Sequence, residues 1–286
     1  MEVLQKGWHN KLNSLFQNVH SELTISSPYI SDGGADFLIK AIPKEFKEKG
    51  LVKFITNLSS KNIYQGATNP YSFKKIFENV NLVQIFHLPN LHAKVYIQDN
   101  KEAIITSGNL TAGGLFNNYE YGTYIFDKKV VSLIKNDLTD YGNLGALVNL
   151  NDILNYCNLT EKVKDIYHKK EKHKSKELDT LLNKAINEAD EKLIELKITD
   201  GKIHTVFEKT ITYLLKQNGA LEQTDINNLL KEIHPDLCDD VDRVINGVHF
   251  GKKWKHAART AIQMLKKQGL VEKQNNKWIL LNQINN

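Results

Sequence analysis

Two pairs of polar side chains near the middle of the chain have types and spacing that suit chemistry on a phosphate. His92 and Lys94 are two residues apart, as are Ser107 and Asn109, and Glu120 follows them. Because side chains alternate along a strand, each pair is expected to share one face of a strand. An ammonium neutralises a phosphate, a hydroxyl and an amide donate hydrogen bonds to it, and an imidazole is left free to attack phosphorus.

The elements that position these side chains alternate between the period of a strand and that of a helix. Strand-like runs are predicted at 23–26, 52–56, 82–86, 91–97, 102–106 and 120–126, and helices at 6–18, 34–41 and 71–79. Strands mixed with helices predict an α/β layered domain. The short spacing between residues 82 and 126 predicts that part of the sheet is antiparallel.

The sequence after this domain changes character twice. Residues 128–160 are predicted to be helix and loop, and from 160 to 198 charged residues become dense around an apolar stripe at helical spacing: Leu178, Leu182, Ala185, Ala189, Leu193 and Leu196. This stripe predicts an amphipathic connector packed on one domain, or a helix that also contributes to dimerisation. Helices about 204–218, 224–233 (with Thr224 as N-cap) and 254–268 then precede a hairpin at 270–280, an order typical of a winged helix.

Composition sets broad limits on the class of protein. The chain has 286 residues, 41% hydrophobic and 25% charged, which excludes a collagen, a coiled-coil rod and a low-complexity chain, and suggests two domains. No apolar run reaches the ~18–20 residues of a membrane span, and the N-terminus lacks a signal peptide. Cys157 and Cys238 are too few for a disulfide scaffold or a cysteine-rich zinc site. An intracellular, cytoplasmic protein that needs no cofactor and binds no membrane is expected.

Charge is unevenly distributed toward the C-terminus. The net charge is +5, but residues 221–240 carry about −5 and residues 251–280 about +7, a directional field of the kind that orients a polyanion. The polar residues around the helix 254–268 are candidate DNA contacts: Lys252, Lys253, Lys255, His256, Arg259, Gln263, Lys266 and Lys267. Five of them are spaced as one basic stripe opposite the apolar stripe: Lys252, His256, Arg259, Gln263 and Lys266. Such a helix suits a major groove, with Arg259 and Gln263 placed for base edges and the lysines for phosphates. The alternative is a solvated basic face on a protein-binding winged helix.

The polar segment resembles a known family. The pattern His92-x-Lys94-x4-Asp99, followed by Thr106-Ser107-Gly108-Asn109, is similar to the HKD motif of the phospholipase D superfamily. Asn118-x-Glu120 falls where its single-motif nucleases carry a supporting Asn and Glu, and the run 26–30 (SSPYI) also resembles the family. Thr106 stands where the family often has Gly, and its side chain is expected to point away from the site. The resemblance covers roughly residues 1–165.

The resemblance implies a mechanism and roles for these residues. The family's histidine attacks a phosphodiester in line, forming a covalent phosphohistidine without a metal, and a second histidine protonates the leaving oxygen. By this resemblance His92 is the nucleophile, and Lys94, Ser107 and Asn109 bind the phosphate. Glu120 orients His92, and Asp99 and Asn118 support the site.

The mechanism implied by the resemblance uses two histidines, but this chain carries only one copy of the motif. His168-x-Lys170 and His173 lie in the charged connector without the downstream pattern, and His87 is expected in a loop, in the core or beside the groove. We therefore expect two chains to pair across a twofold axis, each contributing one His92 to a shared site.

These observations lead to one functional hypothesis with stated alternatives. We expect a phospholipase D-like nuclease domain at 1–165, a helical connector at 166–200 and a winged-helix DNA-binding domain at 201–286. The expected activity is metal-independent cleavage of double-stranded DNA, similar to that of HKD-type type II restriction endonucleases, although the best-known of these carry a different, β-barrel reader. The alternatives are a non-specific HKD nuclease in defence or repair, a reader of modified bases, a non-catalytic DNA-binding regulator and, least favoured, a phospholipase.

Overall fold

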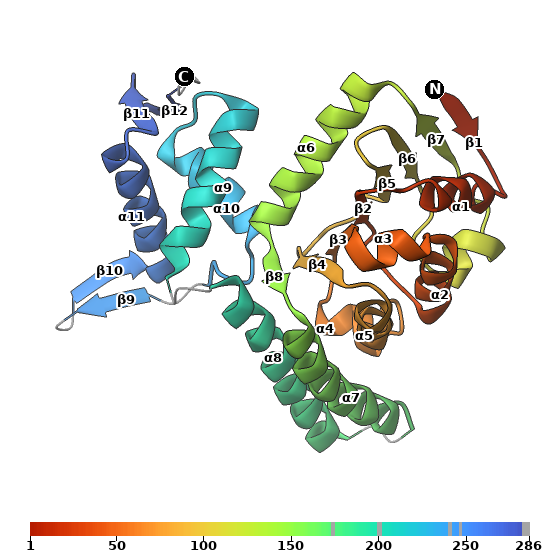
Figure 1. Ribbon diagram of the computed structural model, residues 1–286. Helices are drawn as coiled ribbons and strands as arrows, with labels where there is room; N and C mark the ends of the chain where they lie inside the picture. The colour runs from red at the N-terminus through yellow and green to blue at the C-terminus, as the bar shows by residue number, and fades with distance from the viewer. Residues whose placement is uncertain (173–174, 199–201, 240–241, 246–247, 282–286) are drawn as a thin grey trace. The chain divides into compact units, whose positions relative to one another are not determined.

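The computed structural model describes residues 1–172, 175–198, 202–239, 242–245 and 248–281. It divides the chain into two compact units, Met1–Leu193 and Ile194–Asn286, coloured red to green and green to blue in Figure 1. Each unit buries its own set of apolar side chains. Within the described residues, no helix combines the length and the apolar character that crossing a membrane requires.

The first unit is built on one eight-stranded mixed sheet of order β1-β7-β6-β5-β2-β3-β4-β8. Its strands are β1 (Glu2–Leu4), β2 (Glu22–Ser26), β3 (Leu51–Thr56), β4 (Leu82–His87), β5 (Val95–Gln98), β6 (Glu102–Thr106), β7 (Gly122–Ile125) and β8 (Ala146–Val148). The neighbours β2, β3 and β4 are parallel, whereas the other pairs are antiparallel. The prediction of an α/β domain with a partly antiparallel sheet is confirmed.

Helices cover both faces of this sheet. They are α1 (His9–Gln17), α2 (Asp32–Ala41), α3 (Lys44–Lys49), α4 (Ser60–Tyr64), α5 (Pro70–Asn79), α6 (Lys128–Leu144), α7 (Leu150–Lys172) and α8 (Lys176–Lys197), with a π-helical turn η1 (Gly113–Asn117). Tyr96 of β5 meets Phe16 of α1 and Phe54 of β3 meets Phe73 of α5, so α1 and α5 share one face. The helix α6 contacts β3, β4, β6 and β8 on the other face.

Two predicted strands begin later than the sequence pattern indicated. The strand β5 begins at Val95 rather than at residue 91, because a turn with Asn90 at φ 60° precedes it and the carbonyl of Ala93 accepts from the Ser26 hydroxyl. The strand β7 begins at Gly122, so Glu120 precedes it. The three-residue strands β1 and β8 were not predicted, because so short a run carries no measurable period.

The helix pair α7–α8 occupies most of the predicted connector and packs on the first unit. The apolar stripe of α8 is buried at Leu182, Ala185, Ala189 and Leu193. The Ser60 N–H donates to Asp190, and the Tyr71 hydroxyl donates to Glu161 at 2.7 Å. These contacts tie both helices to α4 and α5.

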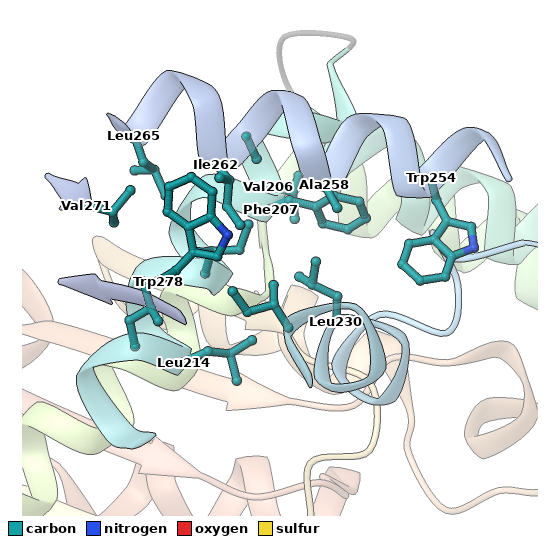
Figure 2. Packing of buried hydrophobic residues seen from close by; sticks show 14 of the residues in the cluster. Val206, Phe207, Leu214, Leu230, Trp254, Ala258, Ile262, Leu265, Val271 and Trp278 are labelled. Carbon is teal, nitrogen blue, oxygen red and sulfur yellow. The ribbon is translucent and has the colours of Figure 1, made fainter. Parts of the chain in front are cut away.

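The second unit contains three longer helices and two small hairpins. They are α9 (Ile203–Asn218), α10 (Gln223–Ile233), β9 (Asp242–Ile245), β10 (Val248–Lys252), α11 (Lys253–Lys267), β11 (Val271–Gln274) and β12 (Lys277–Leu280). Figure 2 shows Trp254, Ala258, Ile262 and Leu265 of α11 directed at the core, where Phe207 of α9 and Trp278 of β12 lie. The predicted helices and C-terminal hairpin are present.

Two features of the second unit differ from the sequence prediction. The hairpin β9–β10 between α10 and α11 was not predicted. The N-cap of α10 is Glu222 rather than Thr224, because Glu222 has extended backbone angles and its N–H donates to Asp225 at 3.4 Å. Thr224 therefore lies inside the first helical turn.

The close approach of α2 to the chain after β6 generates a stability prediction. A Cβ on Gly34 would lie 1.9 Å from the carbonyl oxygen of Leu110, whereas one on Gly142 of α6 would meet Phe86 at 3.4 Å, an ordinary contact. We expect Gly34→Ala to lower the free energy of unfolding by at least about 2 kcal/mol in urea titrations. The matched change Gly142→Ala is expected to alter it by less than about 1 kcal/mol, because alanine favours helix. Equal stabilities of the two variants would contradict this packing.

Candidate active site

His92 and Lys94 lie in the segment that leads into β5, and they contact each other directly. Lys94 is buried, its Nζ lies 3.0 Å from Nε2 of His92, and it also donates to the His92 carbonyl at 2.8 Å. The imidazole itself is exposed. Because an ammonium has only donors, Nε2 must accept and so carries its lone pair. In this pairing Nε2 of His92 is unprotonated, which is the form that a nucleophilic imidazole needs once Lys94 turns to another acceptor.

Ser107 and Asn109 follow β6, which ends at Thr106, so the expectation that they lie on a strand was wrong. The Ser107 hydroxyl donates to Glu120 in a short hydrogen bond and accepts from the Tyr121 N–H at 3.0 Å. The Thr106 hydroxyl donates to the Tyr121 carbonyl at 3.1 Å and accepts from the Gly108 N–H at 3.2 Å.

Glu120 connects the two halves of the site. Its carboxylate accepts from Ser107 and from the Asn118 amide at 3.1 Å. Burial lowers the pKa of Lys94, and the nearby Glu120 charge opposes that shift. Among the hydrogen bonds of the described residues, the partners of Glu120 are these two rather than His92. Lys94 is instead the group that contacts the imidazole.

Asn109 is held so that its side-chain oxygen is buried. Within the described residues, Oδ1 of Asn109 has no hydrogen-bond partner. A Cβ on Gly114 would lie 2.5 Å from the Asn109 carbonyl, so only glycine allows η1 to approach this closely. An unsatisfied buried acceptor costs about 1–3 kcal/mol, which a donor arriving with a ligand would recover.

The run 26–30, at and just after the end of β2, bonds the loops that carry His92 and Asn109. The Ser26 hydroxyl donates to the carbonyl of Ala93, between His92 and Lys94. The Ser27 hydroxyl accepts from the Leu110 N–H at 3.0 Å, next to Asn109. Two adjacent serines therefore hold the imidazole loop and the amide loop in place.

Sequence reasoning missed Trp8, which supports the same loops from α1's N-terminus. Its Nε1 donates to the Gly114 carbonyl at 2.9 Å, and its ring would lie 2.5 Å from a Cβ on Gly108. The Tyr96 hydroxyl donates to the Gly108 carbonyl at 3.0 Å. The glycines at 108 and 114 were the available signal that the backbone here is closely packed.

Asp99 lies in the β5–β6 turn, at the opposite end of β5 from His92. It has φ 47°, and its carboxylate accepts from the N–H groups of His20, Ser21 and Glu22 at 2.7–2.9 Å. Burial alone would raise the pKa of Asp99, but these backbone hydrogen bonds outweigh it, and the pKa lies below 3.8. Asp99 thus joins the hairpin to β2 and does not contact the reacting groups.

The remaining histidines of interest lie elsewhere in the first unit. His87 is buried in β4, where Nδ1 accepts from the Leu58 N–H at 3.0 Å. His168 is exposed on α7 and lies 3.6 Å from Glu171, and Lys170 pairs with Asp179 at 2.5 Å. His173 lies outside the described residues. Across the described part of the chain, no group of three or more His, Cys, Asp or Glu side chains is arranged to hold a metal ion.

The predicted DNA contacts surround α11 in the second unit. Its apolar stripe is buried at Trp254, Ala258, Ala261 and Leu265. The candidate contacts are exposed or half-buried: Lys252, Lys253, Lys255, His256, Arg259, Gln263, Lys266 and Lys267. Helical spacing puts Arg259, Gln263 and Lys266 opposite the apolar stripe, whereas Lys255 borders it, with its Nζ 5.6 Å from the centroid of the Trp254 ring.

Part of the first unit matches a known protein family. Residues 12–141 match the family model described as "Cardiolipin synthase, PLD-like domain", and this range contains all the residues from His92 to Glu120. This part of the chain is a PLD-like domain, and its mixed sheet flanked by helices agrees with the expected fold class. A comparison with curated proteins found no match.

Several solved structures are similar to this chain. Nuc from Salmonella typhimurium, a phospholipase D family member, is 18% identical over 52% of this chain and 98% of its own, with a TM-score of 0.42. NucT from Helicobacter pylori is 16% identical over 49% and 96%, with a TM-score of 0.36. TrmBL2, an archaeal chromatin protein whose structure is described as showing a novel mode of DNA binding, is 17% identical over 51% and 53%, with a TM-score of 0.34.

The hydrogen bonds of Asp99 generate a pH-dependent stability prediction. Asp99→Asn keeps the shape and tolerates φ 47°, but it loses the charge that three N–H groups bind, so we expect a loss of about 1 kcal/mol at neutral pH. A lowered folded-state pKa stabilises the fold above the unfolded-state pKa, and this contribution disappears as the pH falls through the folded value. Urea titrations of the two proteins should therefore converge below about pH 4. The control is Asp137→Asn on the exposed side of α6, and a difference that grows toward acid pH would contradict the assignment.

Proposed function

We propose that this protein is a metal-independent DNA endonuclease in which His92 attacks the phosphorus atom. The observation that supports this most strongly is the contact between buried Lys94 and Nε2 of exposed His92. It lies inside the PLD-like domain, beside the hydroxyl of Ser107 and the amide of Asn109. The set contains a nucleophile, a cation and hydrogen-bonding groups suited to a phosphodiester.

The proposed reaction has two steps. In the first, the Nε2 lone pair of His92 forms a P–N bond, the P–O ester bond breaks, and the leaving oxygen takes a proton from a second imidazole. In the second, water attacks phosphorus, gives its proton to that imidazole, and the P–N bond breaks. Lys94, Ser107 and Asn109 would bind the phosphoryl oxygens, whose charge increases in each transition state.

The second imidazole is proposed to come from another copy of this chain. In-line displacement requires it on the opposite side of phosphorus, so a homodimer with the site on its twofold axis meets the requirement. An apolar surface beside Ser107 supports such contact: Val3 and Ile105 are 56% and 37% exposed, and both are in register with Thr123. Tyr121, whose N–H bonds the Ser107 hydroxyl, is 61% exposed.

The second unit is proposed to be a winged-helix DNA reader. The pairing of Leu221 with Trp278 adds a third extended segment to the hairpin β11–β12, beside α9, α10 and α11. The exposed basic side of α11 then suits a major groove, with Arg259 and Gln263 at base edges. A reader joined to a nuclease supports a type II restriction endonuclease acting on double-stranded DNA. Discrete fragments from a long duplex would support site recognition, and a smear would indicate a non-specific nuclease.

The role of His92 is tested by replacing it. We expect His92→Ala to reduce DNA cleavage at least about a thousandfold, because no other group in the site can form the P–N bond, while DNA affinity is retained. Wild-type cleavage should persist in EDTA. His168→Ala, on the exposed side of α7, is the matched control and should retain full activity. Rates on a labelled duplex and binding by filter retention measure the two properties.

Two outcomes would contradict this assignment. Cleavage that requires Mg²⁺ would exclude the proposed metal-independent route. A monomer in sedimentation, active at the same dilution, would show that the shared site is wrong.

The DNA-reading role of α11 is tested by removing two of its charges. We expect Arg259→Ala with Lys266→Ala to weaken duplex binding and to reduce the slope of log affinity against log salt by about 2, because each residue releases about one counterion. Lys209→Ala, an exposed change on α9, should leave both unchanged. An unaltered salt slope in the double variant would place the DNA surface elsewhere.

A further inference from the structure

Two exposed aromatic side chains lie in the stretch of chain that runs from η1 to Glu120. Tyr119, which precedes Glu120, is 86% exposed, and Phe116 of η1 is 45% exposed. Exposed aromatic rings of this kind can serve as platforms on which nucleobases stack. Tyr119, next to Glu120 in the chain, is placed where a nucleic acid would extend from the phosphate under attack.

Both aromatic residues contact one segment, residues 6–9. The Lys6 Nζ lies 4.0 Å from the centroid of the Tyr119 ring, a cation–π contact. The His9 ring lies 5.0 Å from that of Phe116, edge to face. One short segment therefore supplies a cation and an imidazole to the two rings.

The segment 6–9 is anchored to the catalytic loops. Trp8, at its centre, donates to the Gly114 carbonyl at 2.9 Å and packs against Gly108, which lies between Ser107 and Asn109. Trp8 is only 3% exposed. The backbone that carries Lys6 and His9 is thus anchored, through Trp8, to the loops of the proposed phosphate ligands.

An exposed ring with a cation on one face can take a nucleobase on its open face. Stacking on an aromatic side chain contributes about 1–3 kcal/mol per base, and a nearby ammonium attracts the adjoining phosphate. Bases inside a duplex are already stacked on each other, so they reach such a ring only after leaving the helix. The arrangement therefore favours unpaired nucleotides.

We propose that Tyr119, Phe116 and Lys6 bind unpaired nucleotides next to the scissile phosphate. The substrate class is duplex DNA that is unpaired at the cut, as at a flap or a bubble, and a single strand serves as the simplest probe of this site. This inference rests on the proposed nuclease function and specifies its substrate.

A second copy of the chain is the rival occupant of this surface. An isologous contact here would bring the Lys6 ammonium groups of two chains toward each other, and like charges repel. A polyanion, by contrast, is attracted by the same charge. Charge complementarity therefore favours the nucleic acid.

The experiment compares substrates and variants in EDTA. Labelled DNA of one sequence is offered as a single strand, as a blunt duplex and as a duplex with a central bubble. We expect wild-type kcat/KM to be at least about tenfold higher on the single strand and the bubble than on the blunt duplex. Tyr119→Ala should raise KM for the single strand about tenfold with little change in kcat, whereas Tyr119→Phe should behave as wild type.

The control variant is Phe126→Ala. Phe126 is 57% exposed but follows the opposite end of β7 from Tyr121, so its loss should leave KM unchanged. Stacking is measured separately, with a fluorescent adenine analogue beside the cut: binding should quench its emission in His92→Ala and fail to do so when Tyr119→Ala is added. This readout does not depend on cleavage.

The outcomes separate the two proposals. If wild-type protein cuts all three DNAs equally and Tyr119→Ala changes neither KM nor quenching, this inference is wrong while the nuclease function stands. If Tyr119→Ala converts a dimer to a monomer in sedimentation, the surface belongs to a second copy and the inference is also wrong. If wild-type protein cuts none of the DNAs, the proposed function itself fails.

Discussion

The buried ammonium of Lys94 is the constraint on which the site depends. Removing a lone cation from water costs several kcal/mol unless nearby groups compensate. Lys94 finds its compensation in the carbonyl and Nε2 of His92, and in the charge of Glu120. These partners come from two segments, the approach to β5 and the approach to β7, so the folded ammonium fixes both. The same contact keeps Nε2 of His92 unprotonated.

The sheet order explains why these segments meet. The strands β5, β6 and β7 are antiparallel neighbours. The start of β5, the end of β6 and the start of β7 therefore lie side by side, at the same end of their strands. The adjacent strand β2 ends there too, and its Ser26 and Ser27 bond the two loops. Trp8 closes the arrangement from the α1 side. Four strand ends and one helix start therefore build the site, and the rest of the unit supports them.

The sequence was informative where a regular period extends over several residues. The run 102–106 predicted β6 with its observed bounds, and the helices of the second unit were placed to within a few residues. The predicted strand boundaries were wrong where a side chain, rather than a neighbouring strand, forms the hydrogen bond to the backbone. The Ser26 hydroxyl bonds the Ala93 carbonyl, so the apparent strand at 91–97 begins only at Val95.

Hydrogen bonds between residues far apart in the chain could not be predicted from the spacing of residue types. Nothing near Trp8 or in the run 20–22 indicated that these residues bond Gly114 and Asp99, respectively, because about eighty residues or more separate the partners. The residue types at 92–120 suggested phosphate chemistry, yet the partner of each side chain came only from the fold. Glu120, expected beside His92, bonds Ser107 and Asn118 instead.

The geometry also bears on why one chain is insufficient for the proposed reaction. The attacking imidazole must carry a lone pair, while the imidazole that assists the leaving oxygen must carry a proton, and a single ring cannot meet both needs in one step. In each chain Lys94 already holds His92 in the lone-pair form. A phosphate entering between two such chains would draw both Lys94 ammonium groups toward its own oxygens and so free both rings. One ring would then attack phosphorus, and the other, after taking a proton from solvent, would give it to the leaving oxygen. The substrate itself would then break the symmetry of the pair, and the same lysine would serve the resting site and the reaction.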